Sequence, residues 1–181
     1  ITGGAGFIGS NLARRFNNQK IIILDNLKNG SEENLRGLDN YLFFNIDLSN
    51  FELTLRTMNK INKKYYIKEV WHLAANSDIP AGIENSNIDL KNTFLSTYNT
   101  FYSLSQNPPE RILFSSSSAV YGDFKDEKLF ESSGPLLPIS NYGSMKLSSE
   151  AFLSSWVEKY NSSLYIFRFP NVVGSPATHG V

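Results

Sequence analysis

The sequence TGGAGFIGS, which runs from Thr2 to Ser10, decides the fold. It places Gly3, Gly6 and Gly9 three residues apart, directly before a segment with helical spacing of apolar residues. Glycines let the backbone turn tightly and approach a ligand, and the free N–H groups at a helix start can hold a phosphate. The pattern predicts a turn that binds a pyrophosphate, with an ordinary structural turn as the alternative.

Acidic residues stand at the ends of the next two apolar runs. Asp25 closes the run Lys20–Asp25 and lies 19 residues after Gly6, close to the offset of about 20 residues at which an acid binds the ribose of a dinucleotide. Asp47 closes the following run, where its side chain can reach the adenine. Because a carboxylate at Asp25 would repel a 2′-phosphate, we expect the cofactor to be NAD and not NADP.

Short apolar runs alternate with longer segments of helical periodicity. We expect buried strands at Lys20–Asp25, Tyr41–Asp47, Glu69–Leu73 and Arg111–Ser115, and a further strand at Ser163–Phe169. We expect helices at Ser10–Phe16, Phe51–Ile61, Ile88–Leu104 and Tyr142–Tyr160. This order predicts an α/β fold, a doubly wound (Rossmann) parallel sheet with helices on both faces. Since no Met or strand precedes the glycine turn, and the chain ends on a loop, we expect it to be truncated at both ends.

Composition excludes several classes of function. With 17 Lys+Arg and 17 Asp+Glu the net charge is zero, which gives no electrostatic footprint for nucleic acid or an anionic membrane. The absence of Cys excludes disulfides and cysteine nucleophiles, and the two histidines, His72 and His179, are too far apart to suggest a metal site. The longest aliphatic run, Ile21–Leu24, falls far short of the roughly 20 residues of a membrane span. We expect a soluble, cytoplasmic protein.

Tyr142 and Lys146 are one helical turn apart, at the start of a long helical segment. A cation on the same helix face can stabilise the phenolate and lower the pKa of the tyrosine from about 10. The same spacing recurs at Tyr121 and Lys125, but a Gly-Asp turn signal follows Tyr121. We therefore favour Tyr142 as the base, with an exposed surface pair as the alternative.

A run of serines, Ser115–Ser118, follows the strand expected before this helix. Parallel strands of such sheets present ligand-binding residues at their carboxyl ends, so a serine here can meet a substrate. The alternative is a solvated turn.

Taken together, the motifs resemble the extended short-chain dehydrogenase/reductase family, and are most similar to nucleotide-sugar epimerases of the UDP-glucose 4-epimerase type. They are TGGAGFIGS, LDN (24–26), HLAA (72–75), SSSSAVYG (115–122), YGSMK (142–146) and RFPNVVG (168–174). The C-terminal ATHGV is also similar to bacterial and archaeal members. The resemblance implies that residues 1–170 form an NAD-binding domain lacking its first strand, and that 171–181 begin a sugar-nucleotide-binding region.

The resemblance also implies roles for individual residues. Ser117, Tyr142 and Lys146 correspond to the catalytic serine, base and its partner, and Ser117, Tyr142 and Asn171 are expected to contact the substrate. The expected cofactor-binding residues are Gly3, Gly6, Phe7, Ile8, Gly9, Asp25, Asn26, Asp47, Leu48, Leu73, Ala74, Ala75, Tyr142, Lys146 and Phe169. His72 is then a strand-end residue and not a ligand.

Two departures from the family pattern are visible. Related 4,6-dehydratases carry an Asp-Glu pair where this chain has Ser118 and Ala119, which cannot supply an acid and a base for eliminating water. Thr93 stands where the family has a helix asparagine, with Asn92 just before it.

The function implied is an NAD-dependent epimerase that inverts C4 of a UDP-hexose through a transient 4-keto sugar. The alternatives are a nucleotide-sugar oxidoreductase or reductase of the same family, which would release NAD(P)H, and a non-enzymatic dinucleotide-sensing module. The joint presence of the serine, tyrosine and lysine counts against the last of these.

The helical segments Ile88–Leu104 and Tyr142–Tyr160 carry more aromatics than one buried face easily absorbs. They are Phe94, Tyr98, Phe101, Tyr102, Phe152 and Trp156. Relatives commonly dimerise by packing these two helices into a four-helix bundle, so we expect a homodimer. The alternative is that these aromatics pack on the chain's own sheet.

Overall fold

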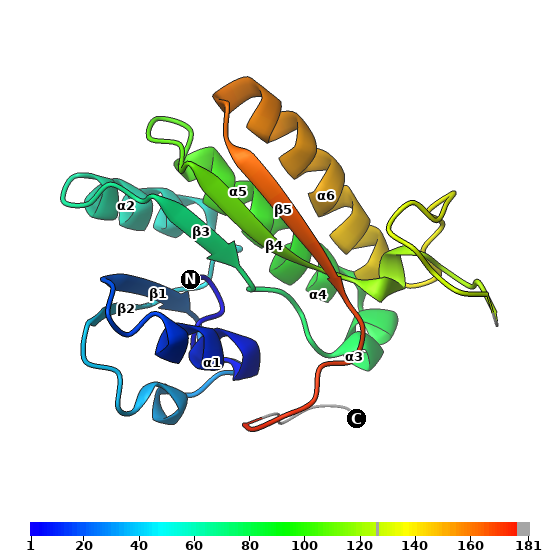
Figure 1. Ribbon diagram of the computed structural model, residues 1–181, viewed down its shortest axis with the longest axis horizontal. Helices are drawn as coiled ribbons and strands as arrows, with labels where there is room; N and C mark the ends of the chain where they lie inside the picture. Colours follow the sequence, from blue (N-terminus) through cyan, green and yellow to red (C-terminus); the bar gives the residue numbers. More distant parts are fainter. Residues whose placement is uncertain (126, 177–181) are drawn as a thin grey trace.

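Strands and helices alternate in the computed structural model, which describes residues 1–125 and 127–176 (Figure 1). The strands are β1 (Ile21–Asp25), β2 (Tyr41–Asn45), β3 (Glu69–His72), β4 (Arg111–Ser117) and β5 (Ser163–Phe169). The α-helices are α1 (Phe7–Arg15), α2 (Phe51–Asn62), α3 (Ile79–Glu84), α4 (Ser86–Asp89), α5 (Ser96–Ser103) and α6 (Asn141–Tyr160). The shorter turns are η1 (Glu32–Leu35), η2 (Leu90–Leu95) and η3 (Ser118–Val120), of which η2 is a π-helix.

The strands pair in parallel in two sets. β1 pairs with β2, and β4 lies between β3 and β5. Thr2 connects the two sets, because it pairs with Leu24 of β1 and with His72 of β3. Parallel pairing requires crossover connections, which α5 supplies between β3 and β4 and α6 between β4 and β5, whereas the connection from β1 to β2 carries only η1. The predicted α/β fold is confirmed.

A groove of about 240 Å³ separates β1 from β3 beside this connection. Its walls include Ile22 of β1, Met58 of α2 and Val70 of β3. The α-amino group of Ile1 donates to the Ile22 carbonyl at 2.7 Å, and burial lowers the pKa of this amino group to about 5. Beyond Thr2, the edges of β1 and β3 therefore face each other without direct pairing between these two strands.

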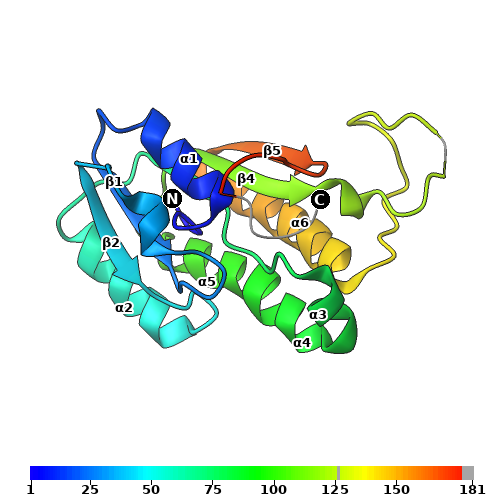
Figure 2. The same ribbon diagram turned by 90° about the horizontal axis from the view of Figure 1, so that it is seen from below.

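Hydrophobic cores lie on opposite faces of the strands, with α1 on one side and α2, α5 and α6 on the other (Figure 2). The core under α2, α5 and α6 contains Leu24, Ile46, Leu48, Met58, Ile61, Val70, Phe101, Leu104, Ile112, Phe114, Leu153, Trp156 and Val157. The core under α1 contains Ala5, Ala13, Ile21, Ile23, Leu35 and Leu38. Helices on both faces are what a doubly wound sheet requires.

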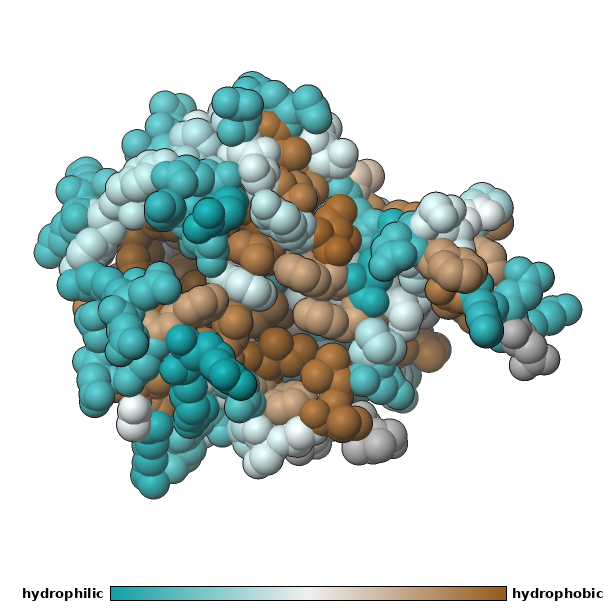
Figure 3. All heavy atoms as spheres, viewed as in Figure 1, coloured by the Kyte–Doolittle hydropathy of each residue, from teal (hydrophilic) through white to brown (hydrophobic). Residues whose placement is uncertain are grey.

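The face of β4 and β5 opposite α6 is largely open. Apolar side chains gather over these strands in the space-filling view (Figure 3). The rings of Trp71, Phe167 and Phe169 stack in a row, with centroids 6.1 and 5.7 Å apart, and Phe167 remains 36% exposed. Beside them Tyr165 is half exposed.

The aromatics of α5 and α6 divide into two groups. Phe101 and Trp156 are buried in the core with ring centroids 5.6 Å apart, so for these two the dimer interpretation is wrong and packing on the sheet explains them. Tyr98 and Phe152 are half-buried, while Tyr102 is 48% exposed. These three, together with half-buried Phe94, lie on the outer side of the two helices.

Each expected strand and helix has a counterpart whose ends differ by up to three residues, except between residues 79 and 95. The burial expected for the strand at Tyr41–Asp47 is wrong, because β2 is only half-buried. The single helix expected at Ile88–Leu104 consists of α4, η2 and α5 in succession, and α3 was not predicted. The tail 177–181, on which part of the expected sugar-nucleotide region falls, lies outside the described residues. Within the described part of the chain, no helix is both long and apolar enough to cross a membrane.

Candidate active site

The glycine-rich turn joins Thr2 to the start of α1. Gly3 has φ +65°, and a Cβ added there would lie 2.8 Å from the backbone nitrogen of Ala74, so the turn requires glycine at this position. α1 begins after Gly6 with no acidic residue in its first turn and no side chain capping its N–H groups. These N–H groups and the positive end of the helix dipole are available to an anion.

Asp25 fastens this turn to the end of β1. Its carboxylate accepts hydrogen bonds from the backbone N–H of Ala5 and of Leu27, both at 2.9 Å, and its side chain is nearly buried. An ionised carboxylate has about four acceptor sites, so it can still receive ribose hydroxyls.

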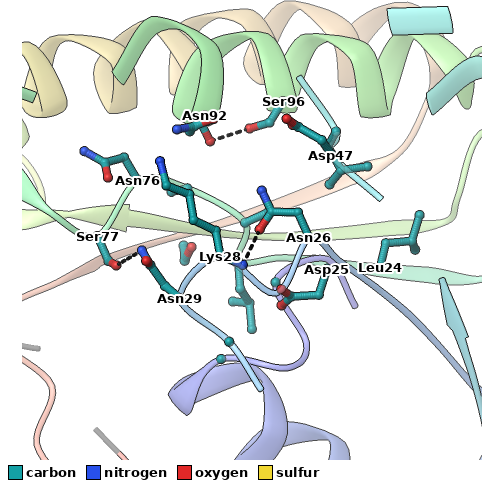
Figure 4. Close-up of a pocket in the computed structure, with 18 of the residues that line it drawn as sticks. Leu24, Asp25, Asn26, Lys28, Asn29, Asp47, Asn76, Ser77, Asn92 and Ser96 are labelled. Atoms are coloured by element: carbon teal, nitrogen blue, oxygen red, sulfur yellow. Dashed lines mark hydrogen bonds between the residues drawn. The ribbon is translucent and has the colours of Figure 1, made fainter. Parts of the chain in front are cut away.

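A pocket of about 270 Å³ opens at this end of the strands (Figure 4). Most of the residues expected to bind the cofactor line it: Gly3, Gly6, Phe7, Ile8, Asp25, Asn26, Asp47, Leu48, Leu73, Ala74 and Ala75. Leu24, Asn92 and Ser115, which the sequence motifs included, also line it. So do seven residues that the sequence had not indicated: Lys28, Asn29, Gly30, Ile46, Asn76, Ser77 and Ser96. The structure thus gathers the glycine turn and three strand ends around one pocket.

The other expected cofactor residues lie outside the lining of this pocket, as does Asn171, which was expected to contact the substrate; these cofactor residues are Gly9, Tyr142, Lys146 and Phe169. Gly9 is buried under the turn, where a Cβ would collide with the carbonyl oxygen of Gly3. Phe169 ends β5 in the aromatic row described above. Asn171 is exposed just beyond β5. Their roles in binding remain predictions.

Ser117 and Tyr142 come together where β4 ends and α6 begins. Ser140 caps α6 by accepting from the N–H of Gly143 at 3.0 Å. A Cβ on Gly143 would lie 2.6 Å from the carbonyl oxygen of Ala119, so glycine lets α6 approach the turn after β4. The Tyr142 phenol is thereby brought beside the Ser117 hydroxyl.

Lys146 lies on the same helix face as Tyr142, one turn further along. Its Nζ is 5.8 Å from the centre of the Tyr142 ring and donates to the carbonyl oxygen of Ser115. Lys146 is almost completely buried, and burial lowers the pKa of its ammonium to about 7 although Glu150 opposes this shift.

The expectation that Lys146 lowers the pKa of Tyr142 is wrong in this structure. Burial raises the pKa of the phenol, the Ser117 hydroxyl opposes that shift, and the carboxylate of Asp89 adds to it. Lys146 directs its ammonium to a backbone carbonyl instead of the phenol. Desolvation of the phenol is therefore the larger effect.

The serine run is not a solvated turn. Ser115 donates to the carbonyl oxygen of His72 at 3.1 Å, and buried Ser116 donates to the carboxylate of Glu150. Ser117 accepts from the N–H of Ala119 at 3.2 Å and starts η3. The first two serines hold the strand, so Ser117 is the serine whose hydroxyl stands beside Tyr142.

Glu150 and Arg168 form a largely buried ion pair between α6 and β5. Arg168 donates from Nη2 and Nε to the two carboxylate oxygens at 2.8 and 3.1 Å, and Ser116 donates to the same carboxylate. Hydrogen bonding by Glu150 raises the pKa of Arg168. The pair thus ties the end of β4 to the helix that carries Tyr142 and Lys146.

Family comparisons agree with this geometry. The model of the NAD dependent epimerase/dehydratase family matches residues 1–180. The chain belongs to this family. NAD is the cofactor after which the family is named.

Similar proteins include enzymes of more than one reaction type. The chain is similar to a UDP-N-acetylglucosamine 4-epimerase from Methanobrevibacter ruminantium solved with UDP-N-acetylmuramic acid (33% identity, TM-score 0.81, 92% of this chain and 52% of that chain). It is similar to a Thermus thermophilus UDP-glucose 4-epimerase solved with NAD (28%, TM-score 0.81, 92% and 53%). It is also similar to a dTDP-D-glucose 4,6-dehydratase of Dictyostelium discoideum (29%, 96% and 43%). The chain spans about half the length of the relatives it matches.

The pocket fits the family's cofactor. It offers free N–H groups at the start of α1 for a pyrophosphate and an acid, Asp25, at the strand end for a ribose. Leu48 and Leu73 supply apolar lining. This combination of donors, acceptor and apolar wall is what a dinucleotide requires.

The π-helix η2 contains Thr93, the residue that stands where the resemblance expects a helix asparagine. Asn92 lines the pocket, whereas Thr93 is buried and its hydroxyl accepts from the N–H of Asn76 at 3.2 Å. A π-turn holds more residues than an α-turn, so it changes which side chain faces the pocket. Asn92 thus reaches the pocket one position before Thr93, the residue that the resemblance aligns with the family's helix asparagine.

Tyr121, the competing tyrosine, has a different environment. It is buried, and residues 121–125 form no helix, with Lys125 at φ +53°. The guanidinium of Arg168 lies 4.9 Å from the Tyr121 ring centre. Tyr121 thus packs against a structural ion pair and has no lysine one helical turn away.

His72 ends β3 and is fully buried in a chain of hydrogen bonds. The Thr2 hydroxyl accepts from the N–H groups of Leu73 and Ala74, at 3.2 and 3.3 Å, which fills both of its acceptor sites and leaves its proton for His72 Nδ1 at 2.8 Å. His72 Nε2 then donates to the Thr97 hydroxyl at 3.0 Å, which donates to the Thr93 carbonyl. This geometry requires a neutral imidazole.

We expect His72 to make the fold acid-sensitive. Burial lowers the pKa of His72 from 6.5 to about 3, so between these values the unfolded chain binds a proton that the folded chain does not. The stabilisation is complete above pH 6.5 and falls as the pH drops, by at most about 1.4 kcal/mol per pH unit. Urea unfolding at pH 7.5 and pH 5 should show a larger loss for the wild type than for His72→Gln. Equal losses would contradict the prediction.

Proposed function

We propose that this chain is the cofactor-binding and catalytic part of an NAD-dependent epimerase that inverts C4 of a UDP-hexose. The observation that carries the proposal is the assembly of Ser117, Tyr142 and Lys146 at the carboxyl end of β4, beside the pocket. Similarity to 4-epimerases that act on UDP-sugars supports it.

The residues of this chain have distinct tasks in the proposed reaction. Tyr142 takes the proton of the 4-hydroxyl as a phenolate, and Ser117 hydrogen-bonds the same oxygen as the carbonyl of the 4-keto sugar forms. Because burial raises the pKa of the phenol, its own proton must first pass to another group, for which we infer the neutral amine of Lys146. Lys146 is the ammonium nearest this phenol among the described residues, and its pKa of about 7 lets it exchange protons near neutral pH. NAD, when bound, supplies reversible hydride acceptance at C4, so return of the hydride to the other face inverts C4 without net oxidation.

A dehydratase is a weaker proposal despite the similarity to one. Elimination of water needs an acid and a base beside the sugar, and η3 carries Ser118 and Ala119 where those groups would stand. Neither side chain titrates near neutral pH.

The proposal is tested by incubating the natural full-length protein with UDP-glucose and with UDP-N-acetylglucosamine. We expect the C4 epimer of at least one of these sugars, detected by NMR, with no net accumulation of NADH. Stoichiometric NADH would favour an oxidoreductase. NAD binding without turnover of any sugar nucleotide would favour a sensing module.

NAD should bind much more tightly than NADP. The carboxylate of Asp25 is held in place by two backbone N–H groups. In the proposed binding mode the 2′-phosphate of NADP would lie beside this carboxylate, and repulsion between the two negative charges would weaken NADP binding. Calorimetry with NAD and with NADP checks this expectation, and equal affinities for the two would contradict it.

We also propose a homodimer formed through the outer sides of α5 and α6. Exposed Tyr102, beside the half-buried rings of Phe94, Tyr98 and Phe152, supports this surface. Light scattering of the natural protein at micromolar concentration should give twice the monomer mass. A monomer would contradict the proposal.

A further inference from the structure

The cofactor pocket has an unusual charge balance. Two carboxylates, Asp25 and Asp47, line it, and Lys28 is the one cation among the described residues of the lining. A dinucleotide brings a negatively charged pyrophosphate into this space. The N–H groups of α1 offset only part of that charge, because a helix end carries about half an elementary charge.

The backbone after β1 is shaped to place Lys28. Asp25 accepts from the N–H of Leu27 at 2.9 Å, and Asn26 accepts from the N–H of Lys28 at 3.0 Å, so two side-chain turns follow each other. Between them Leu27 has φ +58°, a left-handed conformation that is uncommon for a residue other than glycine. The backbone therefore takes this conformation because the two side-chain hydrogen bonds hold it there, and not because leucine favours it.

The result of this conformation is visible in the pocket. The Lys28 side chain extends across it toward Asn76 and Asn92, away from the carboxylate of Asp25 (Figure 4). The next residue, Asn29, donates to the Ser77 hydroxyl at 3.0 Å, which fastens the loop to the segment after β3. Within residues 1–125 and 127–176, Lys28 forms no ion pair, so its charge is available to a ligand.

We propose that Lys28 is the cation that binds the cofactor's pyrophosphate, together with the N–H groups at the start of α1. A 2′-phosphate is the other phosphate that a dinucleotide could offer. It would stand beside Asp25 in the proposed binding mode, whereas the Lys28 side chain points away from that residue. The inference rests on NAD binding and not on the proposed epimerisation.

The test compares Lys28→Met with the wild type in the natural full-length protein. Methionine keeps the length of the side chain without its charge. We expect NAD and ADP-ribose to bind about tenfold more weakly to this variant, since charge-assisted hydrogen bonds to phosphate are the strong ones. Adenosine, which has no phosphate, should bind equally to both proteins. Lys28→Arg should restore most of the affinity.

Salt and a second lysine supply the controls. The difference between wild type and Lys28→Met should shrink at high salt, which a merely structural effect would not do. Lys20→Met should leave NAD affinity unchanged, because Lys20 lies outside the pocket with its ammonium over the Tyr65 ring. Unchanged NAD affinity in Lys28→Met, or weaker binding of NADP alone, would overturn the proposal. These measurements need no turnover, so a failure of the epimerase proposal would be seen separately.

Discussion

Tyr142→Phe is expected to lower turnover by about 10²–10⁴-fold, the range that a general base usually contributes. The substitution removes the phenolic oxygen and leaves the ring, so the packing of α6 against η3 through Gly143 should persist. NAD affinity should survive, because Tyr142 does not line the pocket beside the glycine turn. Measuring epimerisation and NAD binding on the same preparation separates the two effects.

Two companion variants make this result specific. Lys146→Ala should lower turnover as well, and the resemblance implies that it also weakens NAD. Tyr121→Phe keeps the ring on which Arg168 packs, so it should change turnover little. Loss of activity in Tyr121→Phe with activity retained in Tyr142→Phe would show that the base is assigned wrongly.

Glu150→Ala is expected to lower the free energy of unfolding by about 3–5 kcal/mol, as found when one partner of a buried ion pair is removed. The substitution leaves the guanidinium of Arg168 and the hydroxyl of Ser116 without their shared acceptor. Glu158→Ala, at an exposed position of the same helix, is the control and should cost within about 0.5 kcal/mol. Urea unfolding of both variants measures the difference.

The double variant Glu150→Leu with Arg168→Met tests the cause. Replacing both charges by apolar groups removes the unpaired ion, so the double variant should be more stable than Glu150→Ala. If Glu150→Ala unfolds like Glu158→Ala, the ion pair contributes no more than a surface contact.

The strands could be predicted from the sequence because short runs of β-branched and aromatic residues mark them, although β2 is only half-buried and β5 is largely exposed. β5 occupies the residues expected, and β1 differs from its expected run only at Lys20. The glycine-rich turn could also be predicted from the sequence, since the positive φ of Gly3 is a backbone conformation that favours glycine. Where the sequence signal and the physical requirement lie within a few residues, the prediction was accurate.

The remaining features depend on contacts that the local sequence does not encode. Leu27 gives no signal of a left-handed turn, and only the bonds from Asp25 and Asn26 explain why Lys28 enters the pocket. The π-helix η2 likewise has no periodicity of its own, and α3 is too short to show one. The direction of the Lys146 ammonium follows from the carbonyl that β4 presents to it, which spacing on a helix cannot show.

The groove between β1 and β3 has a practical consequence for handling this polypeptide. Residues 1–3 already occupy much of the β1 edge of this groove, because the Ile22 carbonyl and both the N–H and the carbonyl of Leu24 are hydrogen-bonded to them. An extended segment from another chain could pair with β1 here only by displacing these residues. Self-association by strand addition would thus compete with the chain's own first residues, and it would be unrelated to any pairing through α5 and α6.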